Sequence, residues 1–197
     1  MGARYKGAAE HNARRPRRRL SFFHAGPAPK GAGPRSGALR DGLILAPGMK
    51  VGLFGGSFNP AHDGHAHVAE TAMRRLDLDR VVWLVSPQNP LKDARHSAPL
   101  EDRMASARQH ARGPSMIVSD FESRAGVAWT VDTLRDLRAQ IGPQRPLAML
   151  MGADSLLGLP SWHQWEHLLD LAHIVVAERP GSGLDGDLPA ELAQRLK

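Results

Sequence analysis

The stretch 50-KVGLFGGSFNPAHDGH-65 decides the fold, because it joins an apolar strand to the start of a helix through a glycine turn. Residues 50–54 form a short apolar run of the kind found in buried parallel strands. Gly55 and Gly56 follow at once and let backbone N–H groups come close to a phosphate. The helix that opens near Gly64 carries a positive partial charge at its N-terminus. The stretch therefore predicts a strand, an anion-binding loop and a helix in succession.

The same alternation continues along the chain. Further short apolar runs, suited in length to buried strands, lie at 81–85, 116–118, 147–151 and 174–177. Helical stretches lie at 65–76, 99–111, 130–140 and 162–171. Ser161 is the expected N-cap of the last helix. This order gives right-handed βαβ units, so we expect an α/β fold: a Rossmann-like, doubly wound parallel sheet of about five strands with helices on both faces.

The N-terminal tail differs in charge from the body of the chain. Residues 1–48 hold 10 Lys and Arg against 2 Asp and Glu, and residues 49–197 hold 16 against 18, so the tail supplies the whole net charge of +6. Because the tail is rich in Gly, Pro and Ala and shows no sustained period, we expect it to be disordered. Residues 49–197 are expected to form one folded domain.

Four other readings of the tail stay open. Segment 18–23 loosely resembles a twin-arginine export signal, although no apolar stretch follows it. The tail is also compatible with an organelle-targeting peptide, or with an arm that binds nucleic acid through phosphate contacts. The fourth reading places the true start at Met49, directly before the first strand, with residues 1–48 as upstream sequence.

The composition excludes several kinds of site. The chain has no cysteine, which excludes a disulfide, a thiolate metal site and a cysteine nucleophile. No run approaches the ~18–20 unbroken apolar residues of a membrane-spanning helix. These features fit a cytoplasmic protein, which is our expectation; the sequence does not indicate the oligomeric state.

Two histidines stand at the start of the helix that follows the glycine turn. Ligands of parallel sheets bind beyond the carboxyl ends of the strands, which places His62 and His65 in a predicted site. The loop has neither of the familiar phosphate-binding patterns, G-x-G-x-x-G and G-x-x-x-x-G-K-[ST]. Imidazoles here can donate hydrogen bonds to phosphate oxygens and stabilise charge that builds at phosphorus. The alternatives are a metal site that includes His67, or simple capping of the helix.

The segment from Gly55 to His65 resembles the signature of the nucleotidylyltransferase superfamily, whose hallmark is [TH]-x-G-H. His62, Gly64 and His65 match this hallmark residue for residue. The superfamily often has Asp where this chain has Asn59. Because its members use several different acceptors, this motif alone leaves the substrate open.

Four later segments narrow the resemblance to the nicotinate-nucleotide adenylyltransferases. Residues 152–162 resemble that family's G-x-D-S-L-x(3)-P-x-W block, and residues 129–134 its aromatic-[TS]-x-x-T-L block. Residues 87–92 are similar to its proline-bracketed loop ending in lysine, and residues 177–181 to its arginine-proline turn. These segments occur in the family's order between about residues 50 and 181.

The resemblance implies a site with three parts. The catalytic residues would be His62, His65 and Lys92. The nucleotide would bind to Gly55, Gly56, Ser57, Phe58, Gly64, Gly152, Asp154 and Arg179. The pyridine ring would lie against Trp129, Thr130 and Trp162. No residue is assigned as a metal ligand, and Mg²⁺ is expected to arrive with ATP.

Some of these residues have a plainer alternative. Lys92 would then be a solvated loop lysine, Asp154 a helix N-cap, and the two tryptophans core residues. Four further residues are given no part in the chemistry: Trp83 and Trp165 are expected to pack, and Arg103 and Arg124 to form surface or inter-loop ion pairs.

The implied reaction joins the AMP part of ATP to nicotinate mononucleotide. The 5′-phosphate of the mononucleotide would attack the α-phosphorus directly, releasing pyrophosphate and giving deamido-NAD without a covalent enzyme intermediate. The family's C-terminal Ser-[ST]-x-x-[IL]-R segment is absent from this sequence. Two alternatives remain: a superfamily member that uses pantetheine phosphate, and a non-catalytic module that binds nucleotide or RNA. The sequence does not distinguish nicotinate from nicotinamide mononucleotide.

Overall fold

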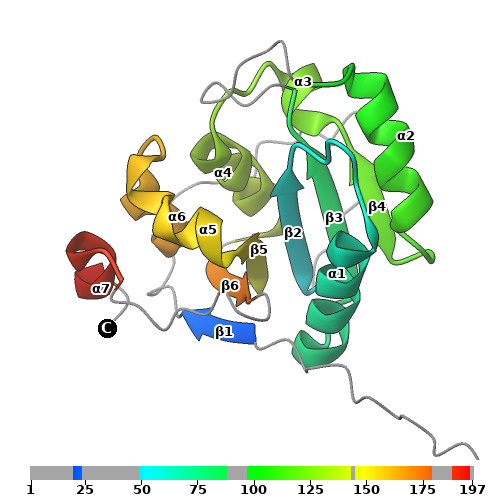
Figure 1. Cartoon of the computed structure of the whole chain (residues 1–197). Coiled ribbons are helices and arrows are strands. Elements are labelled where there is room, and N and C mark those ends of the chain that lie inside the picture. The colour runs from blue at the N-terminus through cyan, green and yellow to red at the C-terminus, as the bar shows by residue number, and fades with distance from the viewer. Residues whose placement is uncertain (1–19, 24–48, 88–96, 143–144, 179–187, 196–197) are drawn as a thin grey trace, which may run out of the picture.

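The computed structural model describes residues 20–23, 49–87, 97–142, 145–178 and 188–195. Its centre is a sheet with the strand order β1-β6-β5-β2-β3-β4 (Figure 1). The strands are β1 (Leu20–Phe23), β2 (Val51–Gly56), β3 (Arg80–Val85), β4 (Met116–Ser119), β5 (Leu147–Gly152) and β6 (His173–Ala177). Strands β2 to β6 are parallel, which confirms the predicted five-stranded parallel sheet.

Strand β1 is a departure from the expected structure of the tail. Its four residues pair antiparallel with β6, from Leu20 opposite Ala177 to Phe23 opposite Ile174. The composition of residues 1–48 predicts no regular structure anywhere in them. That expectation does not hold for residues 20–23, and the rest of the tail lies outside the described residues.

Helices cover both faces of the sheet, as predicted (Figure 1). In β3, Val81, Trp83 and Val85 pack with α1 (Asp63–Leu76) and α2 (Leu100–His110). The alternate residues Val82 and Leu84 pack on the other face with α4 (Thr130–Ile141) and α6 (Trp165–Leu171). This period of two with apolar residues on both sides is what a doubly covered strand requires.

Three short elements were not predicted: α3 (Phe121–Ala125), α5 (Ala153–Leu157) and the 3₁₀-helix η2 (Leu159–Ser161). The expected N-cap at Ser161 was wrong. Its hydroxyl donates to the carbonyl of Gly158, and α6 begins later, after Gln164, whose φ is 50°. The helix predicted at 162–171 is therefore present but begins three residues later than expected. The remaining helix is α7 (Ala190–Arg195).

The strand order changes direction between β2 and β5. From β2 the sheet extends through β3 and β4 to one side, and through β5 and β6 to the other. Such a switch point leaves a crevice at the carboxyl ends of the two central strands. Among the described residues, no helix is both long and apolar enough to cross a membrane.

Candidate active site

A cavity of about 630 Å³ opens at the carboxyl ends of the central strands. Its wall combines the ends of β2, β3, β5 and β6 with the loops and helix starts that follow them. Every predicted site residue within the described ranges lines it: Gly55, Gly56, Ser57, Phe58, His62, Gly64, His65, Trp129, Thr130, Gly152, Asp154 and Trp162. Lys92 and Arg179 lie outside the described residues.

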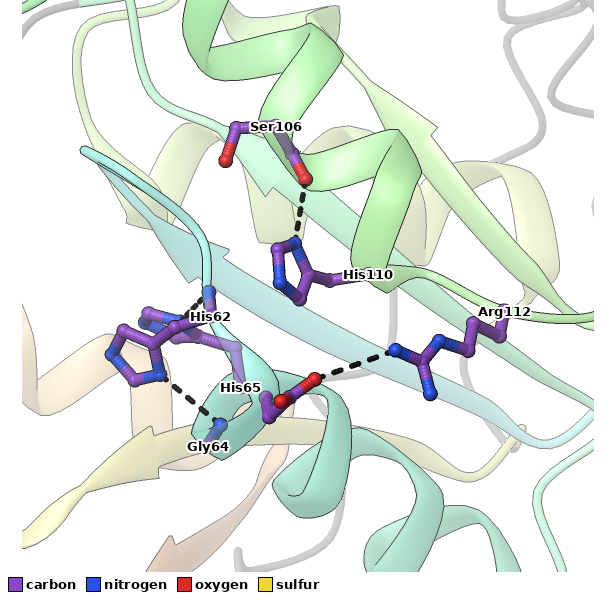
Figure 2. Close-up of polar contacts among 7 residues, drawn as sticks. His62, Gly64, His65, Ser106, His110 and Arg112 are labelled. Carbon is purple, nitrogen blue, oxygen red and sulfur yellow. Dashed lines mark hydrogen bonds and ion pairs between the residues drawn. The ribbon is translucent and has the colours of Figure 1, made fainter.

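The two histidines form a reciprocal cap at the start of α1 (Figure 2). The backbone N–H of Gly64 donates to Nδ1 of His62 at 3.1 Å, and the backbone N–H of His62 donates to Nδ1 of His65 at 3.2 Å. A neutral imidazole that accepts through Nδ1 carries its proton on Nε2. When the two rings are neutral, the cap therefore places the proton on Nε2 in both of them.

Two phenylalanine side chains pack against the ring of His65. Its ring centroid lies 5.1 Å from that of Phe58 and 5.9 Å from that of Phe54. Phe58 is only 2% exposed and stacks on Trp83 at 5.2 Å. The side chain of Phe58 is thus an anchor of the loop in the core, and Trp83 is the packing residue that was predicted.

Gly55 and Gly152 leave open space beside the backbone. A Cβ built on Gly55 or on Gly152 would meet no other atom within 4 Å. Both residues line the cavity at the ends of β2 and β5. The backbone at these two positions is therefore accessible to a bound group, as expected of a loop that accommodates phosphate.

Asp154 lies in the first turn of α5 and not at its cap. The N-cap position is occupied by Gly152, and the exposed carboxylate of Asp154 lines the cavity. The alternative reading of Asp154 as an N-cap is therefore wrong. A carboxylate in this position can accept hydrogen bonds from the hydroxyls of a ribose.

A second group of residues that line the cavity is aromatic. Trp129 is 40% exposed and precedes α4, and its ring centroid lies 4.8 Å from that of His163. Trp162 follows η2 and is half-buried, with one part packed against the core and another lining the cavity. Trp165 packs against the core, as predicted. Flat aromatic faces in the cavity wall suit a flat ring.

Two titratable residues of this wall, Glu122 and His163, were missed by sequence reasoning. Burial raises the pKa of the Glu122 carboxyl above its ordinary value, and a hydrogen bond from the Thr133 hydroxyl at 3.1 Å opposes that shift. No motif marked either residue: Glu122 belongs to a five-residue helix that is too short to show a period, and His163 lies just beyond the matched block at 152–162.

The arginine predictions had different outcomes. Arg124 forms the expected ion pair with Asp120, from Nε to Oδ1 at 2.7 Å. For Arg103 the prediction of an ion pair was wrong. Its side chain is buried and donates to backbone carbonyl oxygens of two loops and of the turn before α2. Burial lowers the pKa of its guanidinium from the ordinary value.

The described residues contain no group of three or more His, Asp or Glu side chains arranged to hold a metal ion. His67, which the alternative metal reading required, is exposed on α1 and does not line the cavity.

Comparison with known proteins gives consistent relatives. Residues 53–195 match the cytidylyltransferase-like family. A probable nicotinate-nucleotide adenylyltransferase from Caulobacter sp. (strain K31) is 56% identical over 136 residues, which cover 69% of this chain and 71% of the relative. One from Parvibaculum lavamentivorans is 51% identical over 153 residues, covering 77% and 76%.

A solved structure shares the fold at low sequence identity. It is the Plasmodium falciparum nicotinic acid mononucleotide adenylyltransferase complexed with NaAD, which is 17% identical to this chain. The two superpose with a TM-score of 0.62 over 75% of this chain and 71% of the other. This likeness confirms the fold.

Proposed function

The chain belongs to the cytidylyltransferase-like family and, within it, to the nicotinate-nucleotide adenylyltransferases, and on that premise we propose how its cavity acts on its substrates. The reaction joins the AMP part of ATP to nicotinate mononucleotide and gives deamido-NAD and pyrophosphate. The names of the relatives favour this reaction over the use of pantetheine phosphate and over a non-catalytic role.

One observation carries the proposed arrangement of the substrates. The histidine pair after β2 and the tryptophans near α4 and η2, far apart in the sequence, line the same cavity. We place the phosphates at the histidine end and the pyridine ring against Trp129 and Trp162. Asp154, at the end of β5, would accept hydrogen bonds from a ribose, and the backbone of Gly55 and Gly152 would lie beside the nucleotide.

The histidines would act as hydrogen-bond donors and not as bases. Their Nδ1 atoms already accept from the backbone, so Nε2–H is the group that meets a phosphate oxygen. Negative charge on the transferring group grows toward the transition state, and fixed donors stabilise it there at no cost of reorganisation. The N-terminus of α1 adds its own positive partial charge at the same place.

Three further parts of the proposal rest on chemistry alone. Lys92 would neutralise charge on the leaving pyrophosphate, and Arg179 would contact the nucleotide. Mg²⁺ would enter as part of the MgATP substrate. A cytoplasmic location also stays a prediction.

The reaction is tested by measuring pyrophosphate release with MgATP and each of three acceptors. These are nicotinate mononucleotide, nicotinamide mononucleotide and pantetheine phosphate. We expect turnover with the nicotinate form and weaker or no turnover with the other two. Turnover with pantetheine phosphate alone, or with none of the three, would contradict the proposal.

A further inference from the structure

Helix α2 supports the loop that leads into the histidine pair. The hydroxyl of Ser106 accepts a hydrogen bond from the backbone N–H of Ala61 at 3.0 Å. Just before the helix, the backbone N–H of Ala98 donates to Oδ1 of Asn59 at 3.1 Å. Figure 2 shows α2, with Ser106, lying beside the loop and the start of α1. The residues immediately before His62 are thus held from one side by a single helix.

Arg103 adds a third and stronger contact from the same helix. Its Nη1 donates to the carbonyls of Ser57 at 2.9 Å and Ser86 at 2.7 Å. Its Nη2 donates to the carbonyl of Pro87 at 2.7 Å, and its Nε to that of Ala98 at 2.9 Å. One planar group therefore joins the loop after β2, the loop after β3 and the turn before α2.

Burial of the charged Arg103 guanidinium costs free energy, so a contribution to stability does not by itself explain why an arginine is there. Arg103 is 2% exposed, and its partners among the described residues are neutral carbonyls without a carboxylate. The guanidinium keeps its proton, because its pKa starts so high that burial does not remove the charge. A buried cation without a counter-ion is usually no more stabilising than an apolar side chain of similar size. What the Arg103 guanidinium provides is geometry, because its rigid, planar set of N–H donors fixes the directions of several acceptors at once.

We propose that Arg103 is a positioning residue for adenylyl transfer: it holds residues 57–61 so that His62 and His65 meet the transferring phosphate in reactive geometry. The inference rests on the proposed function of the cavity. Catalysis by fixed donors depends steeply on placement, and an error of about 1 Å can cost about 10²-fold in rate. Loss of the Arg103 contacts leaves both imidazoles in the chain but releases the loop that carries them.

Arg138 provides a matched control. Its Nε donates to the carbonyl of Leu171 at 3.0 Å and its Nη1 to that of Gly142 at 3.3 Å, and burial lowers its pKa too. It lies near the end of α4 and does not line the cavity. Arg103→Gln and Arg138→Gln thus both remove a guanidinium from backbone carbonyls, although Arg138 is only half-buried, and only the first releases the histidine loop.

The experiment measures kcat, KM and Tm for both variants, at a temperature where both are folded. We expect both to lower Tm, and only Arg103→Gln to lower kcat, by about 10- to 10²-fold. Its KM for nicotinate mononucleotide should stay within about threefold of wild type, because other elements carry the pyridine end. Arg103→Lys keeps the charge without the fork and should recover only part of kcat. A wild-type kcat in folded Arg103→Gln would overturn the proposal.

A second measurement does not depend on turnover. Amide hydrogen exchange of residues 57–64 should be faster in Arg103→Gln and unchanged in Arg138→Gln. If wild type turns over none of the acceptors, the proposed function fails, while unchanged exchange in Arg103→Gln would separately sink the role of Arg103. If Arg103→Gln does not fold, Arg103→Lys decides the matter, because it keeps the charge and removes the fork. An unchanged kcat in folded Arg103→Lys would overturn the proposal.

Discussion

The hydroxyl of Thr133 donates a hydrogen bond to the carboxylate of Glu122, and this bond joins α3 to α4 in the wall of the cavity. Thr133 is completely buried and Glu122 is mostly buried. A carboxyl in such surroundings is disfavoured in its charged form, because burial removes the water that would solvate it. The pair therefore makes the stability of this part of the fold depend on pH.

Glu122→Gln should reveal that dependence. The folded-state pKa of Glu122 lies above its ordinary value of 4.5, so the folded chain binds the proton more tightly than the unfolded chain. Stability from this group is therefore present below the unfolded pKa and is lost as the pH rises through the folded pKa. The free energy of unfolding of wild type, minus that of Glu122→Gln, should fall as the pH rises above 4.5. Urea denaturation at a series of pH values measures this difference, and a flat or rising difference would contradict the prediction.

Thr133→Val extends this test. The hydrogen bond from Thr133 lowers the pKa of Glu122, so its removal should move the fall in stability to higher pH. The same denaturation series checks the direction of the shift. A shift to lower pH would show that the bond acts in the opposite sense.

His62 serves two purposes that substitution can separate. His62→Asn keeps a good N-cap for α1 but places no imidazole N–H at the phosphate end, so it should lower kcat by about 10²-fold while Tm changes little. His62→Ala loses the cap as well and should reduce the free energy of unfolding by a further ~1 kcal/mol. Steady-state kinetics and thermal melts of both variants give the two quantities. Equal kcat values in wild type and His62→Asn would exclude the donor role.

Trp162 and Trp165 form a matched pair at the pyridine end, because only Trp162 lines the cavity. Trp162→Leu should raise KM for nicotinate mononucleotide by about 3- to 10-fold through loss of ring stacking, with KM for ATP nearly unchanged. Trp165→Leu should lower Tm and leave both KM values near those of wild type. Kinetics with one substrate varied at a time measure the difference. A rise in KM for ATP alone would place the pyridine ring elsewhere.

Substitution by alanine should have different effects at two glycines of β2, lowering stability at one and weakening nucleotide binding at the other. A Cβ at Gly52 would lie 2.8 Å from Leu78 Cδ1 and 3.2 Å from Val81 Cγ2, so Gly52→Ala should cost about 1–3 kcal/mol of stability and leave kcat unchanged. At Gly55 the added Cβ would meet nothing within 4 Å, so Gly55→Ala should keep Tm. It should nevertheless raise KM for ATP, because the backbone there is proposed to lie against the nucleotide. An unchanged KM for ATP in Gly55→Ala would contradict that placement.

The strands and the histidine loop could be predicted because their signals are local. Apolar runs such as 81–85 are buried on both faces and need no other information, and the histidine spacing around Gly64 marks a helix start directly. The bounds of α1 and α4 followed from their periodicity within two residues of those observed. Local sequence was least informative near Ser161, where η2 and α6 are separated by a residue with positive φ.

The environments of Arg103 and Glu122 could not be predicted in this way. Arg103 sits on a helix whose pattern suits a solvated arginine, and its burial arises only when two loops from different strands fold over it. Glu122 lies in a one-turn helix, too short to show a period, and its partner is on a different helix. Both depend on contacts between segments far apart in the chain, which periodicity does not record.

Strand β1 has a consequence for how this chain meets other chains. Because Leu20–Phe23 pairs with β6, the backbone donors and acceptors along that side of β6 are already used. A chain that lacked residues 1–48 would instead present β6 as a bare edge, and an uncovered edge is a template on which another molecule can add a strand. Removal of residues 1–48 would therefore replace a strand pairing within the molecule by a tendency to associate with other molecules along β6.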